Sequence, residues 1–253
     1  AVRILLRRHE TKSPAEEAVV LRLARLHSRL GDRDRAMARL EVWLFQSADV
    51  TLDAWALWLE LASLSPRLDP HALVARLPPE AAAAEKKGQL VEDVRWLLES
   101  LARSGAVRIN CCGTEYTDHA GNVWGADRFS EGGEWHSSFR PEMRNTLDPR
   151  LYWDRRRFWA HDLRPGYLIP LPSGRYQITL HFTEPNSGTN QGLFDIVLEG
   201  KKVLERYAPG ALGFAVADQK QFLVDVEDGA LEIELPPLER SSQISWIEVE
   251  VVK

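Results

Sequence analysis

Apolar residues between Ser13 and about Arg103 recur at the spacing of amphipathic helices. The first segment, SPAEEAVVLRLARLHSRLGD, opens with a serine cap followed by proline and glutamate, which is typical of a helix N-terminus, and Gly31 ends it. The next segment, DRDRAMARLEVWLF, follows at once, so the two predict an antiparallel helical hairpin. TLDAWALWLELASL, DPHALVARL and LVEDVRWLLESLARSG predict further helices, the last of which ends at Gly105.

After Gly105 the apolar period changes to two, which is the alternation of half-buried strands. The segments RYQITLHF, LFDIVLEG and ISWIEVEVV each place alternate apolar residues on one face. FLVDVEDGALEIEL sets two such runs around Asp228 and Gly229, and this pattern predicts a hairpin with a two-residue turn. Several short strands without a helical pattern between them predict an antiparallel β-sandwich. We therefore expect two domains, a helical one over residues 1–104 and a sandwich over residues 105–253.

Composition and charge argue against a membrane-spanning protein and against a nucleic-acid-binding protein. The chain has 253 residues, of which 44% are hydrophobic and 27% charged, the balance of a soluble globular protein. Its apolar runs are too short to span a bilayer, and the opening AVRILLRRHETK has too short an apolar core for a signal peptide. From Gly105 onward 22 acidic residues stand against 16 basic ones, so the basic excess that nucleic-acid binding requires is missing. The dense run Arg155 to Arg157 is interpreted as a solvated loop.

Two adjacent cysteines, Cys111 and Cys112, cannot make a disulfide framework and rarely bond each other, which favours a reducing compartment and a cytoplasmic location. Because the chain opens on alanine, a piece of a longer protein is the alternative. A cysteine nucleophile would need His119 or His136 as its base, and the same residues lack metal-ligand spacing. Glycoside hydrolysis needs two carboxylates that flank the scissile bond, and four acidic residues in loops could in principle supply such a pair: Asp118, Asp127, Glu131 and Glu134. Acidic residues in loops are more commonly solvated or cap turns. We expect no catalytic residue, metal or cofactor.

The helical part, through LARLHSRLGDRDRAMARLEVWL, resembles the tetratricopeptide repeat family over roughly one and a half repeats. The following unit lacks the usual glycine turn and repeat length. The resemblance implies a peptide-binding surface. A plain helical bundle that acts as a spacer is the alternative.

The second half carries RINCCG, YTDHAGNVWGAD, GYLIPLPSGRYQITLHFTE, FDIVLEGKKVL and IEVEVV in an order that resembles a malectin-type domain over residues 106–253. The resemblance implies a jelly-roll-like sandwich that binds glucose-containing oligosaccharides without catalysis, through aromatic and acidic residues in loops. An aromatic face packs on the apolar face of a pyranose, while polar groups bond its hydroxyls. Matched position by position, the implied carbohydrate-binding residues are Tyr116, Asp118, Trp124, Asp127, Trp135 and Tyr152.

Three places depart from the family pattern. Cys112 stands where the family has a glycine, a residue that permits a positive φ. Residues 164–166 replace aromatics that the family tends to place before the next strand, and either Glu239 or Arg240 occupies the place of the last sugar-contacting acid. The leading hypothesis is a glucan-binding protein whose helical domain is a spacer or a protein-interaction surface. The alternative is an intracellular interaction or sensor module of a larger protein, which keeps the fold and binds a protein partner instead of sugar.

Overall fold

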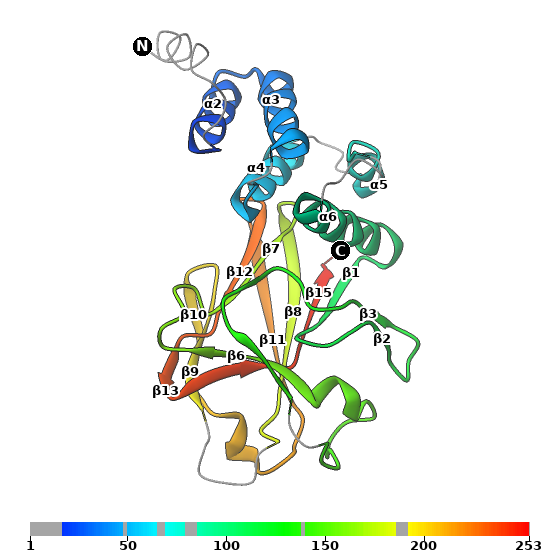
Figure 1. Ribbon diagram of the computed structural model, residues 1–253, viewed down its shortest axis with the longest axis vertical. Coiled ribbons are helices and arrows are strands. Elements are labelled where there is room, and N and C mark those ends of the chain that lie inside the picture. The colour runs from blue at the N-terminus through cyan, green and yellow to red at the C-terminus, as the bar shows by residue number, and fades with distance from the viewer. Residues whose placement is uncertain are drawn as a thin grey trace. The chain divides into compact units, whose positions relative to one another are not determined.

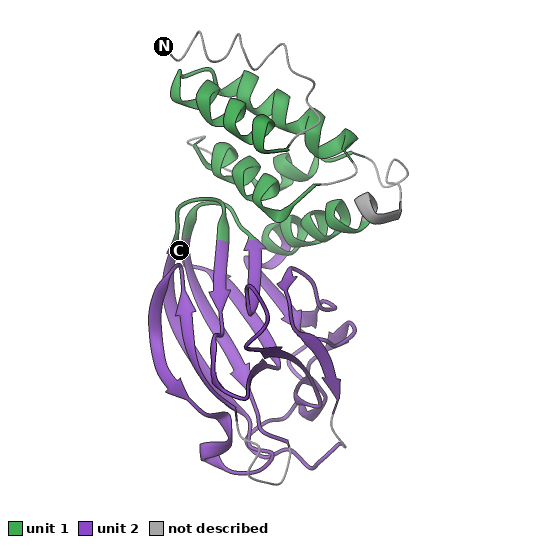
Figure 2. Ribbon diagram, turned by 60° about the vertical axis from the view of Figure 1, so that its left-hand side comes forward, with its two compact units in different colours: residues 1–102, 170–174, 226–230 green, residues 103–169, 175–225, 231–253 purple. Residues whose placement is uncertain are grey.

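The computed structural model describes residues 17–47, 50–64, 69–78, 85–137, 140–185 and 192–252 (Figure 1). The chain divides into two compact units (Figure 2). Unit 1 comprises Ala1–Ala102, Pro170–Gly174 and Val226–Ala230, and unit 2 comprises Arg103–Ile169, Arg175–Asp225 and Leu231–Lys253. Helices come first and antiparallel sheets follow, which confirms the predicted fold class. The independence of residues 1–104 as a domain stays a prediction.

The helices begin and end where the sequence places caps and turns. Gly31, at φ +78°, makes the tight turn of the first hairpin, and the side chain of Asp32 accepts from the Arg35 N–H at the start of the next helix. Asp69 caps a short helix that begins with proline. The predicted serine cap at Ser13 lies outside the described residues. The helices in the described part of the chain are α2 (Glu17–Arg29), α3 (Arg33–Gln46), α4 (Leu52–Ser63), α5 (Pro70–Val74) and α6 (Glu85–Ser104).

Helix α4 forms the centre of the helical core. Both Trp55 and Trp58 on it are fully buried, and their rings meet edge to face at 5.8 Å. A buried indole must find an acceptor for its N–H, and Trp58 donates to the Glu41 carboxylate at 3.1 Å. The tryptophans of this segment are therefore core residues, as the helical spacing predicts. The tetratricopeptide-like assignment stays a prediction.

Unit 2 is built from open antiparallel sheets. One sheet has the order β1 (Ala106–Asn110), β15 (Trp246–Val251), β8 (Gly174–Phe182), β11 (Asp218–Val226). A second has the order β10 (Lys201–Tyr207), β9 (Leu193–Leu198), β12 (Ala230–Glu234), β7 (Gly166–Pro170), β4 (Ser130–Glu131), with β13 (Pro237–Glu239) paired to β9. Two smaller sheets are β14 (Ser241–Ile244), β6 (Asp154–Trp159), β5 (Glu134–Ser137) and the pair β2 (Tyr116–Thr117), β3 (Val123–Trp124).

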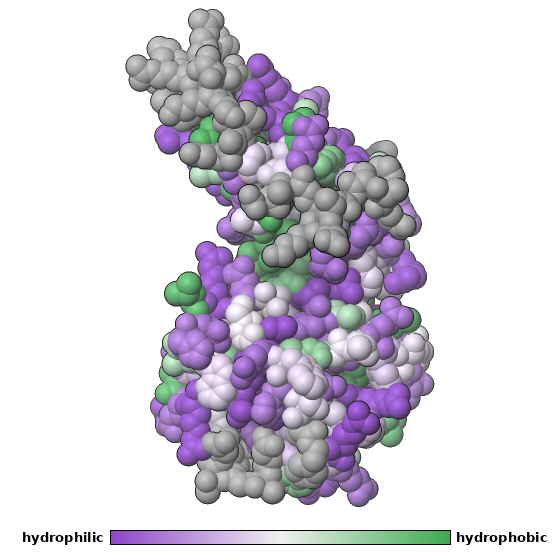
Figure 3. Space-filling model, in the orientation of Figure 1, coloured by the Kyte–Doolittle hydropathy of each residue, from purple (hydrophilic) through white to green (hydrophobic). Residues whose placement is uncertain are grey.

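The core lies between the two larger sheets. Phe182 of β8 meets Phe194 of β9 at 5.9 Å and Tyr207 of β10 at 4.9 Å, so the inner faces of the sheets touch through aromatic rings. Alternate residues of the central strands, such as Ile247 and Val249 of β15, are fully buried. The predicted sandwich is confirmed. On the face shown in Figure 3, hydrophilic residues cover most of unit 2 and hydrophobic residues form small separate patches.

The predicted hairpin at Asp228 and Gly229 is wrong. Strands β11 and β12, which flank this turn, belong to different sheets, so the turn is an arch across the sandwich. Gly229 has φ +86°, and a Cβ on it would collide with the carbonyl oxygen of Ala56, so only glycine fits. In unit 1, to which this turn is assigned, the arch therefore packs closely on α4. A hairpin and an arch need the same turn residue and the same alternation, and the sequence cannot separate them.

Candidate functional site

The loop between β2 and β3 is organised by the carboxylate of Asp118. Its Oδ1 accepts from the backbone N–H groups of Ala120 and Asn122 at 2.9 and 2.8 Å. Its Oδ2 accepts from Nδ2 of Asn122 at 3.0 Å and from Nε1 of Trp124 at 2.9 Å. Burial raises the pKa of Asp118, but the bonds from Trp124 and Asn122 outweigh it and lower the pKa below the usual value. Asp118 therefore uses its acceptors within its own loop.

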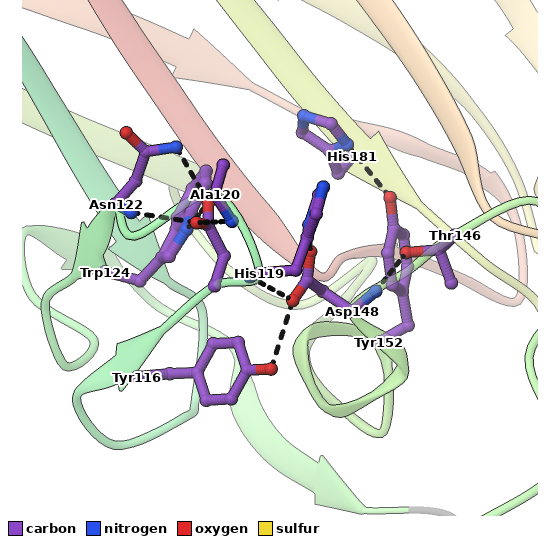
Figure 4. Close-up of polar contacts among 10 residues, drawn as sticks. Tyr116, His119, Ala120, Asn122, Trp124, Thr146, Asp148, Tyr152 and His181 are labelled. Atoms are coloured by element: carbon purple, nitrogen blue, oxygen red, sulfur yellow. Dashed lines mark hydrogen bonds and ion pairs between the residues drawn. The ribbon is translucent and has the colours of Figure 1, made fainter.

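A second carboxylate, Asp148, joins this loop to the segment before β6 (Figure 4). Its Oδ1 accepts from the Tyr116 hydroxyl at 3.1 Å and from the His119 backbone N–H at 2.9 Å. Its Oδ2 lies 2.5 Å from Nδ1 of His119, whose side chain is half exposed. Burial, and then the bond to Asp148, raise the pKa of Tyr116. The groups that meet at this carboxylate are therefore the half-exposed imidazole of His119 and the half-buried phenol of Tyr116.

Beneath these loops lies a group of stacked rings, which we call the ring cluster: Trp124, Tyr152, His181 and Trp246. The His181 imidazole stacks on the Trp246 indole, with centroids 3.3 Å apart and planes 10° apart, and Trp124 meets Trp246 edge-on at 4.0 Å. The Tyr152 hydroxyl lies 3.0 Å from Nδ1 of His181. Burial lowers the pKa of His181 to about 3, so the imidazole is neutral at neutral pH. The cluster is a small second core on the outer side of the four-stranded sheet.

Four of the six predicted sugar contacts meet here, in or beside the ring cluster, namely Tyr116, Asp118, Trp124 and Tyr152. Trp124 is only 1% exposed and Tyr152 only 3%, so their ring faces pack against protein. Tyr116 is half-buried on β2. The exposed ring faces that stacking on a pyranose requires are therefore absent at Trp124 and Tyr152. Their carbohydrate-binding role stays a prediction.

Asp127, the fifth predicted residue, is held by an arginine that sequence reasoning missed. Nε and Nη2 of Arg156 donate to its Oδ2 at 2.9 and 2.7 Å, and the Tyr167 hydroxyl donates to its Oδ1 at 3.0 Å. Nη1 of Arg156 donates to the carbonyl oxygens of Gly132 and Gly133, both at 3.0 Å. This network ties the loop before β5 to strand β6.

The interpretation of the arginine run as a solvated loop is wrong. The three residues lie in β6, and the side chains of Arg155 and Arg157 are buried. Nε of Arg155 donates to Oε1 of Gln243 at 2.8 Å, and Nε of Arg157 donates to Oγ of Ser241 at 2.9 Å. Both acceptors lie on the neighbouring strand β14, far away in the sequence, which is why the run reads as solvated by itself.

Trp135, the sixth predicted residue, lies on strand β5 with its side chain 62% exposed. It is paired with Arg156 across β5 and β6, while its neighbours Glu134 and His136 are paired with Arg157 and Arg155. Directly paired residues share a face, so Trp135 points to the Arg156 side and its neighbours point to the other. Trp135 is therefore joined to Asp127 through a single residue.

The opposite face of β5 and β6 carries a second indole. Nε1 of Trp159 donates to Oε1 of Glu134 at 3.0 Å, and the Arg157 guanidinium lies 5.0 Å from the Trp159 ring. Burial, with the nearby Arg155 and Arg157 charges, lowers the pKa of His136. A neutral imidazole is both a hydrogen-bond donor and an acceptor. The face therefore offers a ring, a carboxylate and a neutral imidazole.

The surroundings of the two cysteines do not support a role as a catalytic nucleophile. Cys111 is fully buried, and burial, followed by the nearby Asp127 charge, raises the pKa of its thiol. The same causes raise the pKa of Cys112, so neither thiol is a thiolate at neutral pH. Cys112 has φ +60°, the conformation for which the family pattern has glycine. Within the described ranges no group of three or more histidine, cysteine or acidic side chains is arranged to hold a metal ion.

The residues that organise these networks, Asp148, Arg156 and His181, were not predicted as site residues. Asp148 stands just before Pro149 and the predicted Tyr152 in NTLDPRLY, and an aspartate before proline is typical of a turn, which is the one signal that the sequence offers. The other two stand in strands and have no local motif. Among the described helices, none combines the length and the apolar character that a membrane crossing requires.

Comparisons with known proteins identify the β-rich half. The family model described as Malectin domain matches residues 106–249. No curated protein matches the sequence. The crystal structure of a β-glucuronidase from Bacteroides uniformis aligns with a TM-score of 0.54 and 20% identity over 58% of this chain. The plant receptor-like kinases FER and ANX2 each align over 58% of this chain with a TM-score of 0.48, at 23% and 18% identity.

The matched part is a minor share of each of these proteins. It spans 18% of the glucuronidase chain, 42% of the FER chain and 48% of the ANX2 chain. At 20% identity the likeness to the enzyme shows a shared fold and no more. The family match covers more than half of the sequence and confirms the resemblance drawn from its motifs. The chain belongs to the malectin domain family.

Proposed function

We propose that this protein is a non-catalytic module that binds a glucose-containing oligosaccharide at the β5 strand, with Trp135 as the stacking plane. The observation that carries the proposal is the exposure of this indole, 62%, on a regular strand. An indole left in water forgoes roughly 2 kcal/mol of burial free energy, and tryptophan is enriched at the surfaces through which proteins bind. In this proposal Trp124 and Tyr152, which are buried in the ring cluster, stabilise the loops and do not contact the sugar.

The chemistry around Trp135 suits a neutral sugar. Strand β5 lies at the edge of its three-stranded sheet, and an edge strand presents backbone N–H and C=O groups, which match the hydroxyl groups on the rim of a pyranose stacked on Trp135. Glu134 and His136 point to the opposite face of the strand. The Arg156 guanidinium donates to Asp127 and to two carbonyl groups, so it fixes the strand. Strands hold side chains more precisely than loops do. The arrangement supports binding and orientation of a ligand, and it assigns no residue to bond cleavage.

The proposed assignment extends to the rest of the chain. A single shallow ring platform gives modest affinity, since drug-sized ligands gain only about 0.3 kcal/mol per heavy atom. Linking such a module to other binding modules raises the overall affinity through effective concentration. We assign the helices the role of a spacer or a protein-interaction surface in a cytoplasmic assembly.

The test is a titration of the full chain with maltose and longer glucans, followed by the indole N–H signals in a proton–nitrogen spectrum. We expect the Trp135 signal to shift at millimolar sugar and binding to be lost in Trp135→Ala. Leu163→Ala is the matched control, because this exposed side chain lies outside β5 and its loss leaves the platform intact. Unchanged sugar binding in Trp135→Ala would refute the proposed platform. Absence of any shift for all glucans would refute carbohydrate binding.

A second candidate function is a protein-interaction module that keeps the fold without sugar binding. The observation that favours it is the internal use of two predicted acids, since Asp118 and Asp127 bind their own loops and strands. In that case the exposed Trp135 contacts a protein. A defined partner that protects the Trp135 signal, in the presence of excess glucan, would favour this function over the first.

A further inference from the structure

Away from β5, two loops of unit 2 are joined into one rigid surface. The Arg144 N–H donates to the Ala215 carbonyl oxygen at 2.8 Å, and the Ala217 N–H donates to the Arg144 carbonyl oxygen at 3.0 Å. Nδ2 of Asn145 adds a bond to the Ala217 carbonyl oxygen at 2.9 Å, and Arg144 is bridged to Val216. The loops are therefore tied to each other by main-chain bonds, as strands are.

The backbone of this junction is strained. Ala215 has φ +52°, which an alanine adopts only at a cost of about 1 kcal/mol or more, whereas Asn145, at φ +61°, is of a residue type that tolerates this region. Ala215 and Asn145 stand on opposite sides of the junction that Arg144 makes. Strain of this kind persists only where the surrounding contacts enforce it, and it is more frequent at binding surfaces.

The side chains that the junction presents are apolar and basic. Leu147 is 74% exposed, Leu212 54% and Phe214 38%, although large apolar side chains are usually buried. Nη2 of Arg144 donates to the Phe214 carbonyl oxygen at 2.7 Å, which places its guanidinium beside the backbone of the segment that carries Leu212 and Phe214. We call the exposed apolar and basic side chains of the two joined segments the arginine–leucine patch: Arg140, Arg144, Leu147, Arg150, Leu212 and Phe214.

The charge of the patch is opposite to that of the domain around it. From Gly105 onward the chain has 22 acidic and 16 basic residues. Between Arg140 and Arg150 the acids are Glu142 and Asp148, and Asp148 is buried with both oxygens bonded to other groups. Three exposed arginines therefore face a single exposed carboxylate, a local reversal that favours an acidic partner.

We propose that the arginine–leucine patch is a docking surface for an acidic segment of a partner protein that carries apolar side chains. Arginine guanidinium groups bind carboxylates in a paired geometry, and arginine and aromatic residues contribute most of the free energy in protein interfaces. Aliphatic Leu147 and Leu212 offer no ring plane to a sugar, so the patch differs in chemistry from the proposed glucan platform. Because the loops are already rigid, little conformational entropy is lost when a partner binds.

The experiment measures fluorescence anisotropy of the full chain with a labelled short peptide in which glutamates flank a leucine and a phenylalanine. The matched probe has lysine in place of each glutamate, and phosphatidylserine vesicles test a lipid surface. We expect the acidic peptide to bind, with an affinity that falls about tenfold in Leu147→Ser and in Arg150→Glu. These side chains are exposed, so both variants are expected to fold.

Two controls and three outcomes decide the proposal. Leu163→Ser and Lys201→Glu change an exposed leucine and an exposed cation elsewhere, and both are expected to bind the acidic peptide as the unchanged protein does. Equal binding of the lysine peptide, unchanged binding in both patch variants, or stronger binding to the vesicles than to the peptide would each overturn it. The glucan titration uses other residues, so either proposal can fail without the other.

Discussion

The ring cluster and strand β5 place the same type of side chain in opposite surroundings. Trp124 is 1% exposed and Trp135 is 62% exposed, although both stand in short strands between loops. Trp124 is buried with its N–H bonded to Asp118, and its ring fills a gap between loops and sheet. A buried polar edge needs such a partner, so an acceptor in the same loop allows the indole to turn inward. The comparison teaches that a tryptophan with a hydrogen-bond acceptor for its N–H in the same loop becomes a buried structural residue. The type of ring by itself does not distinguish such a residue from one that can contact a ligand.

The largest expected effect separates the two tryptophans by stability. Trp124→Ala removes a buried indole and leaves a cavity, which is expected to lower the free energy of unfolding by about 4 kcal/mol. Trp135→Ala changes an exposed side chain, so we expect a change within about 0.5 kcal/mol. Urea unfolding followed by circular dichroism measures both. Equal losses in the two variants would mean that the cluster and the strand do not differ in packing.

The next effect is a pH dependence that is larger in the ring cluster than at strand β5. The pKa of His181 is lowered by burial from 6.5 to about 3, so the unfolded chain binds a proton that the folded protein excludes. Stability from this group is therefore present above the unfolded pKa and is lost as the pH falls toward the folded pKa. Between about pH 7 and about pH 4 the loss amounts to roughly 3 kcal/mol.

The variant that isolates this effect is His181→Gln, which keeps a polar partner for the Tyr152 hydroxyl and cannot titrate. Its unfolding free energy is expected to fall less steeply over the same pH range. The carboxylates titrate in both proteins, so the difference between the two curves reports the histidine. As a control on the β5 side, His136→Gln is expected to change the slope less, because His136 is only partly buried. Parallel curves for His181→Gln and the unchanged protein would contradict the buried, neutral imidazole.

A smaller effect on stability is expected from the carboxylate of Asp118, which accepts the hydrogen bond of the Trp124 indole. Asp118→Asn replaces one acceptor oxygen by an NH₂ group that faces the donors of Asn122 and Trp124, and the expected loss is about 2 kcal/mol. Because hydrogen bonds lower the pKa of Asp118 in the folded protein, its contribution is present above the unfolded pKa and disappears as the pH falls through the folded pKa. Unfolding in urea at neutral and acid pH tests this, with the exposed Asp225→Asn as control. A loss that persists unchanged at low pH would contradict the role of the carboxylate.

The sequence predicts the helices and strands well here, because both the spacing of apolar residues and the residues that form turns are local features. The helices of unit 1 follow from apolar spacing and from turn residues such as Gly31 and Asp69. The strands follow from alternation, and the family motifs place them in a malectin sandwich. Even the unusual backbone at Cys112 was indicated, since the family has glycine where this chain adopts φ +60°.

Partners across the sheets are the part that the sequence does not reveal. The turn at Gly229 looks like a hairpin because alternation specifies a buried face without saying which strand lies beside it. Arg155 is buried through a bond to Gln243, which stands 88 residues away, so its charge alone suggests a solvent-exposed side chain. The direction of Trp124 depends in the same way on Asp118 and on residues of three other segments in the small core.

The smallest expected effect lies beside the β5 network, at Cys112. This residue has φ +60°, which costs a residue with a Cβ about 1 kcal/mol relative to glycine, while glycine also gains entropy in the unfolded chain. We expect Cys112→Gly to raise the thermal midpoint by about 2 °C. Gly121→Ala is the reverse control. Gly121 has φ +85° and open space around it, so an added methyl group meets no neighbour and tests only the cost of the backbone conformation. This variant is expected to lower the thermal midpoint. A lower midpoint in Cys112→Gly, together with the expected fall in the control, would mean that packing of the Cys112 side chain near Asp127 and Arg156 outweighs the backbone strain.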